Sequence, residues 1–98
     1  MNAGDLRGPL YQIAFTDATS DGTIDIDFPD ITNISIPITS DMKASDIAES
    51  FSNIVVENHR IIHPKGQSYA DVECMTNAYS KYPTISATGA TATVIKKR

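Results

Sequence analysis

Apolar and polar residues alternate over residues 23–28, in the stretch TIDIDF. Alternation places every second side chain on the same face of a strand, so the three apolar side chains would be buried while Asp25 and Asp27 face solvent. Other stretches rich in aromatic, aliphatic and β-branched residues are typical of strands. These are residues 10–15, 31–38 and 68–76, and two short pieces on either side of Gly89.

Pro37 interrupts the strand predicted over residues 31–38. Proline has no backbone N–H and cannot donate to a strand ladder, so we expect this strand to run along the edge of a sheet or to end at Pro37. An edge that is not guarded offers unpaired backbone groups to another chain. Pro37 is therefore a candidate interface residue.

The spacing of apolar residues changes after residue 40. They recur three and four positions apart, as on one face of an α-helix. We expect Ser40 or Ser45 to cap the start of this helix and Asn58 to end it. The sequence thus predicts one amphipathic helix over about residues 41–58, with an apolar stripe of Ala44, Ile47, Ala48, Phe51, Ile54 and Val55.

The order of these elements is β-β-β-α-β-β-β, which predicts an α+β fold. The helix must bury its stripe, so we expect it to pack on a mainly antiparallel sheet of five to six short strands. A chain of 98 residues is about one domain, and we place that domain at residues 10–98, with a short basic C-terminal tail. Residues 1–9 have little to bury and are expected to form a flexible N-terminal arm.

The composition, 41% hydrophobic and 20% charged, is that of an ordinary globular protein, but its charge is uneven. Residues 1–50 hold nine acidic and two basic residues, and residues 51–98 hold three acidic and six basic ones. The net charge of −4 argues against nucleic acid as the primary partner. Acidic and basic halves would suit head-to-tail contact between copies, although solvated loops of either sign give the same pattern. The candidate contact residues are Arg7, Asp25, Asp27, Pro37, Lys96, Lys97 and Arg98.

No arrangement of residues predicts a catalytic, cofactor or metal site, and we expect no enzymatic activity. The acidic residues between positions 17 and 30 do not have the spacing of a calcium-binding loop. His59 and His63 are four residues apart, but Asn58 and Pro64 argue against a helix that would bring them together. Cys74 alternates with Ala70 and Val72 and is expected to be a small core residue.

Localisation signals are equally sparse. No apolar run approaches the roughly 18 residues that span a bilayer, so we expect no membrane contact. The first ten residues lack the basic and apolar regions of a secretory signal, which predicts synthesis in the cytoplasm. The single cysteine, Cys74, allows no internal disulfide.

Three segments together resemble small modules of tailed-bacteriophage virion proteins, such as tail, baseplate and connector components. They are GTIDID, ISIPITSDMKASDIAESFSNIVVEN and TISATGATATVIKKR. The resemblance implies a non-enzymatic structural or assembly protein of the virion, made in the host cytoplasm. It would act in many copies by binding itself and other virion proteins, without a small-molecule substrate. The alternative is a small acidic adaptor or regulatory factor that binds a basic protein.

Overall fold

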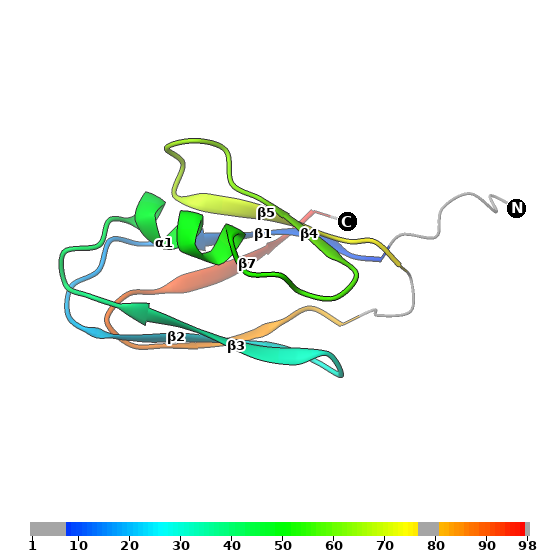
Figure 1. The fold of residues 1–98 in the computed structure, drawn as a ribbon, viewed down its shortest axis with the longest axis horizontal. Helices are drawn as coiled ribbons and strands as arrows, with labels where there is room; N and C mark the ends of the chain where they lie inside the picture. Colours follow the sequence, from blue (N-terminus) through cyan, green and yellow to red (C-terminus); the bar gives the residue numbers. More distant parts are fainter. Residues whose placement is uncertain (1–7, 77–80, 98) are drawn as a thin grey trace, which may run out of the picture.

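Two antiparallel sheets lie face to face in the computed structural model, which describes residues 8–76 and 81–97 (Figure 1). The larger sheet contains, in spatial order, β4 (His59–Ile62), β5 (Tyr69–Cys74), β1 (Leu10–Phe15) and β7 (Ala92–Lys96). The smaller sheet contains β3 (Thr32–Ile38), β2 (Gly22–Phe28) and β6 (Thr84–Ala87). The helix α1 (Ala44–Ser52) contacts β5, β1 and β4 of the larger sheet and β3 of the smaller one.

The expected α+β class, with one helix packed on antiparallel sheets, is confirmed. The described residues form seven strands in two sheets, whereas the sequence pattern predicts one sheet of five to six strands. The additional strand is β4, which pairs with β5. In its sequence HRII, Ile61 and Ile62 are adjacent, so the strand has no clear alternation; Ile61 is half-buried and Ile62 is exposed. Residues 59–62 therefore form a strand because they pair with β5, and not because of their own apolar and polar pattern.

The core lies between the two sheets and is closed on one side by α1. Alternate residues of β1, β2 and β5 point into it, so the predicted inward set of Ile24, Ile26 and Phe28 is confirmed. The Phe15 and Phe51 rings meet edge to face at 5.8 Å, which joins the helix to the larger sheet. The most deeply buried large side chains are Tyr11, Phe28, Phe51, Ile13, Ile24, Ile26, Ile47, Val72 and Cys74.

The helix is shorter than predicted, because it runs over Ala44–Ser52 and not over residues 41–58. Lys43 occupies the N-cap position, and neither Ser40 nor Ser45 caps the helix. Carboxylates accept the first backbone N–H groups instead: Asp46 Oδ2 accepts from Lys43 N at 3.0 Å, and Asp17 Oδ1 accepts from Ala44 N at 2.8 Å. The position of the start therefore depends on an acid far away in the chain.

The last part of the predicted helix is an extended connection to β4. Asn53 is the C-cap, and Asn58 does not end a helix but takes a positive φ of 59° in the turn before β4. Ile54 is half-buried and Val55 is 93% exposed, whereas Val56 is buried. The stripe thus ends at Phe51, because the chain must leave the helix there to reach the edge of the larger sheet.

The two connections that pass between the sheets, residues 16–21 and 88–91, lie side by side at one end of the molecule. Thr19 N donates to Gly89 O at 2.7 Å, and Thr91 N donates to the Thr16 hydroxyl at 3.0 Å. Gly89 has a φ of +83°, and a Cβ added there would lie 2.5 Å from Ser20 O. The backbones therefore approach too closely for a side chain at this position.

The different environments of Phe51 and Val55 predict opposite effects of the same substitution. Phe51→Asp should unfold the protein, since an unpaired buried charge costs several kcal/mol out of a total stability of about 5–15 kcal/mol. Val55→Asp should change the free energy of unfolding by less than about 0.5 kcal/mol, because Val55 lies in solvent. Chemical denaturation followed by circular dichroism measures both. A folded Phe51→Asp protein would show that the stripe does not face the core.

The close approach at Gly89 predicts a second pair of effects. Gly89→Ala should cost about 3 kcal/mol, because it combines a left-handed backbone with a clash against a neighbouring backbone. Gly66→Ala is the matched control: Gly66 has a φ of +79° but open space around it, so only about 1 kcal/mol should be lost. Thermal denaturation compares the two. Equal losses would mean that the connections do not need to touch.

Candidate interaction surfaces

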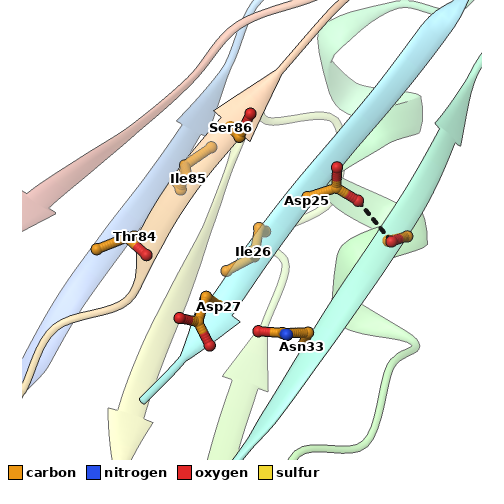
Figure 2. A pocket seen from close by; sticks show the side chains of 8 residues that line it. Asp25, Ile26, Asp27, Asn33, Thr84, Ile85 and Ser86 are labelled. Carbon is orange, nitrogen blue, oxygen red and sulfur yellow. Dashed lines mark hydrogen bonds between the residues drawn. The ribbon is translucent and has the colours of Figure 1, made fainter.

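The outer face of the smaller sheet carries short polar side chains from all three of its strands. Register places Asp25 between Ser35 of β3 and Ser86 of β6, and Asp27 next to Asn33 and Thr84. All of these side chains are exposed, and Figure 2 shows them on one face of the sheet. We refer to the residues Asp25, Asp27, Asn33, Ser35, Thr84 and Ser86 as the polar face.

The polar face is a shallow, open depression of about 420 Å³. The Ser35 hydroxyl donates to Asp25 Oδ1 at 2.5 Å across the strand pair, which fixes the orientation of that carboxylate (Figure 2). The alternation in residues 23–28 predicted the exposure of both carboxylates. It did not predict Ser35 as a partner, because the register of β3 on β2 was unknown.

The remaining acidic residues of this region do not join the polar face. Asp17 is bonded to the first turn of α1, and Asp21 Oδ1 accepts from Ser40 N at 2.8 Å just before the helix. Asp30 lies in the turn between β2 and β3, with its Oδ2 3.8 Å from Lys81 Nζ. The acid-rich stretch is therefore divided into Asp17 and Asp21 near the helix start, Asp30 in the β2–β3 turn, and the pair Asp25 and Asp27 on the polar face.

The basic candidates lie at the end of β7, in the larger sheet. Lys96 pairs with Tyr11 in the ladder, and its Nζ lies 4.8 Å from the centre of the Tyr82 ring. Lys97 is exposed, and its backbone N–H donates to Leu10 O at 2.9 Å. The described part of the predicted basic tail is therefore attached to β1.

The candidates Arg7 and Arg98 lie outside the described residues, as do residues 1–7 of the predicted arm. Its remaining residues, Gly8 and Pro9, bond with the backbone of Cys74.

Pro37 lies on β3, which forms one edge of the smaller sheet, so the edge position predicted from this proline is confirmed. The strand pairs with β2 on one side and has no strand partner on the other within residues 8–76 and 81–97. Thr32, Asn33, Ser35 and Pro37 are exposed. This edge is a second candidate contact surface beside the polar face.

His59 and Cys74 lie directly opposite each other in the β4–β5 pair, whereas His63 lies beyond the end of β4. His59 is the first residue of β4, and His63 follows the strand. The Nδ1 of His59 lies 2.7 Å from Glu57 O, and the Nε2 of His63 lies 2.8 Å from Gln67 O. Cys74 is buried, with its Sγ 3.1 Å from Thr76 O. In the part of the chain that the structure describes, no three His, Cys, Asp or Glu side chains are grouped to hold a metal ion. No helix there is long and apolar enough to cross a membrane.

A second open depression, about 450 Å³, lies between the exposed face of α1 and the connection from β4 to β5. Asp46 and Glu49 line it from the helix, and His63 and Lys65 line it from the connection. No local pattern in the sequence connects these residues, because the two segments are far apart in the chain. Charges of both signs line it, so it does not favour one charge of ligand.

Tyr11 is the most unusual polar group of the core. The side chain is 1% exposed, and its hydroxyl has no hydrogen-bond partner among the described residues. Burial raises the pKa of Tyr11 far above its usual value, and the nearby Cys74 and Tyr82 raise it further. The Tyr82 ring meets it edge to face at 5.5 Å. The Tyr11 phenol therefore stays neutral in the folded protein.

The Tyr11 environment predicts a loss of stability in alkali. The phenol has its ordinary pKa, about 10, in the unfolded chain and a raised pKa in the fold. The stability that the neutral Tyr11 phenol contributes to the fold is therefore fully present below about pH 10, and it is lost as pH rises through the pKa of the folded state. Tyr11→Phe should lie within about 1 kcal/mol of the natural protein at pH 7 and should become relatively more stable above pH 10. Denaturation at pH 7 to 11 checks this, and parallel losses in both proteins would contradict it.

The described residues thus carry three candidate contact surfaces: the polar face, the edge of β3, and the end of β7 at Lys96 and Lys97. Exposed side chains are found on all three, and the polar face is also an open depression. No protein-family model, curated protein or solved structure matches this chain.

Proposed function

We propose that this chain is a non-enzymatic structural or assembly protein that works in many copies. Its partners would be other copies of itself and other structural proteins. The setting we propose is the virion of a tailed bacteriophage, because the order of strands and helix resembles that of tail, baseplate and connector modules. The observation that supports assembly most directly is the separation of exposed charges onto different sheets.

The acidic and basic candidates occupy different parts of one molecule. Asp25 and Asp27 lie on the outer face of the smaller sheet, while Lys96 and Lys97 lie at the end of β7 in the larger sheet. The ion pairs found among the described residues involve none of these four side chains; they are Arg60–Glu73 and Lys81–Asp30. Asp25 and Lys96 do have contacts within the copy, but with the neutral Ser35 hydroxyl and Tyr82 ring, so their charges can still attract opposite charges on neighbouring molecules. An acidic surface on one copy can therefore face a basic surface on the next.

Each such contact would be weak. An exposed ion pair contributes roughly 0–1 kcal/mol, so one acid–base contact does not hold two molecules together. Repeated contacts in a multi-copy assembly add up, since each further bond forms at high effective concentration. The same weakness gives the assembly a sensitivity to salt, because the Debye length falls to about 3 Å at 1 M ionic strength.

The basic end of β7 gives a direct test of assembly. The double variant Lys96→Ser and Lys97→Ser should weaken self-association severalfold at low ionic strength, as measured by sedimentation velocity. The control is Lys43→Ser with Lys65→Ser, which changes the net charge equally at exposed positions elsewhere. The two variants should converge at high salt. If both weaken association to the same degree, only net charge matters and the β7 end is not a contact surface.

Purified particles test the setting. If the proposal is right, mass spectrometry of purified virions should find the chain at a fixed number of copies relative to known structural proteins. Absence from particles, together with one tightly bound soluble partner, would overturn the proposal in favour of the adaptor. A basic partner that protects the polar face would then be the expected finding.

A further inference from the structure

The edge strand β3 is long and uncharged. Its sequence TNISIPI covers seven residues and contains no acidic or basic side chain. Proteins usually guard exposed edges with charged side chains, with very short strands or with proline, because a free edge pairs with other strands. In β3 the guard is Pro37 alone. By comparison, β4, which forms one edge of the larger sheet, has four residues and includes the exposed Arg60, whose guanidinium pairs with Glu73.

The backbone directions along β3 follow from its partner strand. Thr23 N donates to the Thr88 hydroxyl at 3.0 Å, and Thr23 O accepts from Thr88 N at 2.9 Å. Both backbone groups of Thr23 therefore point away from β3, so its opposite residue, Pro37, also points its backbone away from β2. Alternate residues share this direction, which places the free groups of Asn33 and Ser35 on the open edge as well.

Asn33 and Ser35 each offer one N–H and one C=O at this edge, whereas Pro37 offers a C=O only. The Thr32 hydroxyl lies 3.4 Å from Asn33 O, and a carbonyl oxygen has a second lone pair for another donor. The edge thus ends in a position that can accept but cannot donate. This asymmetry restricts how a second strand can pair with it.

We propose that β3 pairs in antiparallel fashion with β3 of a second copy, about a two-fold axis at Ile34. This inference rests on the proposed assembly function and names its first contact. In this register Asn33 faces the partner's Ser35 and Ser35 faces the partner's Asn33, so four backbone hydrogen bonds form. Both the N–H and the C=O of Asn33 and of Ser35 are used in each copy. The two smaller sheets then become one continuous sheet.

Pro37 selects this register. A shift that centres the pairing on Ser35 would place Pro37 opposite the partner's Asn33, whose carbonyl would then face no donor. A shift in the other direction would require the N–H of Ile31, which already donates to Phe28 O at 3.0 Å. The register centred on Ile34 is the one that pairs the N–H and the C=O of both Asn33 and Ser35 in each copy, with Pro37 at the end of the pair.

The side chains fit the same register. Ile34 is half-buried on the core side of β3, and the partner's Ile34 would lie directly opposite, in the kind of pair where side chains approach most closely. On the outer face, Asp25 and the partner's Asp27 would be separated by Ser35 and the partner's Asn33. Three strand spacings place these carboxylates about 14 Å apart, beyond the Debye length at 0.15 M salt. Figure 2 shows β3 at the margin of the sheet, with α1 behind it.

A disulfide across the axis tests the register. In a Cys74→Ser background, Ile34→Cys should give a covalent dimer under mild oxidation, because antiparallel neighbours of this kind lie within disulfide reach. Thr32→Cys is the matched control. It lies on the same side of β3, but the two copies of residue 32 would be four residues apart along the pair, so little dimer should form. Equal cross-linking at both positions, or none at residue 34, would overturn the proposal.

A second pair of variants removes the edge donor. Ser35→Pro deletes the outward N–H and should weaken dimerisation at least tenfold in sedimentation equilibrium. Ser35→Ala loses the same hydroxyl contact with Asp25 but keeps the N–H, and should stay within about threefold of the natural chain. Circular dichroism checks that both variants are folded. If Ser35→Pro does not fold, the cross-link at residue 34 alone tests the pairing. Dimerisation of Ser35→Pro with unchanged affinity would contradict the pairing.

The outcomes separate this inference from the proposed function. A chain that is found in virions but does not cross-link at residue 34 would retain the assembly function and lose the β3 contact. A chain that cross-links at residue 34 but is absent from particles would retain the contact and lose the virion role. A chain that remains monomeric at all concentrations and is absent from particles would overturn both.

Discussion

The close approach of residues 16–21 and 88–91 is the constraint on which the rest of the structure depends. Residues 16–21 connect β1 to β2, and residues 88–91 connect β6 to β7, so each connection passes from one sheet to the other. The strands that they connect are also paired: β1 with β7 in the larger sheet, and β2 with β6 in the smaller one. Hydrogen bonds between the connections hold the two sheets at a fixed offset. Because Gly22 meets the Thr88 backbone and Gly89 meets the Ser20 backbone, the contact needs two residues without a side chain.

The helix depends on the same end of the molecule. Asp17 accepts the N–H of Ala44, and Ala18 N donates to Met42 O at 3.0 Å, so the first connection determines where α1 begins. An acceptor at this point satisfies a backbone donor that the helix itself leaves unpaired, and its negative charge suits the positive end of the helix dipole. Through α1, the crossover also positions Phe51 on the larger sheet. The acidic residues near the connection thus contribute to the fold, which leaves Asp25 and Asp27 as the exposed acids of β2.

Local periodicity predicted the elements whose pattern comes from one buried face. The alternation of residues 23–28 identified β2 and both of its exposed carboxylates, and Pro37 identified the edge. The pattern could not find β4, because four residues with adjacent isoleucines become a strand only when β5 is present. It extended the helix to residue 58, since Ile54 and Val55 continue the helical spacing although the chain has already turned away. The division into two sheets could not be read from local pattern, because it depends on which distant strands pair with one another.

The candidate surfaces divide in the same way. The exposure of Asp25 and Asp27 and the edge position of Pro37 could be predicted from the sequence, because each follows from the residue and its immediate neighbours. The partnership of Ser35 with Asp25 and the contact between Lys96 and Tyr82 require the register of the strands and the path of the chain. The direction of the free backbone groups along β3 is a further step away, since it follows from a hydrogen bond between β2 and the residue after β6.

The pairing of β1 with β7 has a consequence for how the chain folds as it is made. Synthesis proceeds from the N-terminus, so β1 is available long before residues 92–96 exist. Until then, one side of β1 has no ladder partner, and the first connection lacks the Gly89 carbonyl to which Thr19 donates. Such non-local pairings form slowly, because the ends of a long segment must first be brought together. The larger sheet is therefore completed only when β7 has left the ribosome, and until then the growing chain presents the edge of β1 to its surroundings.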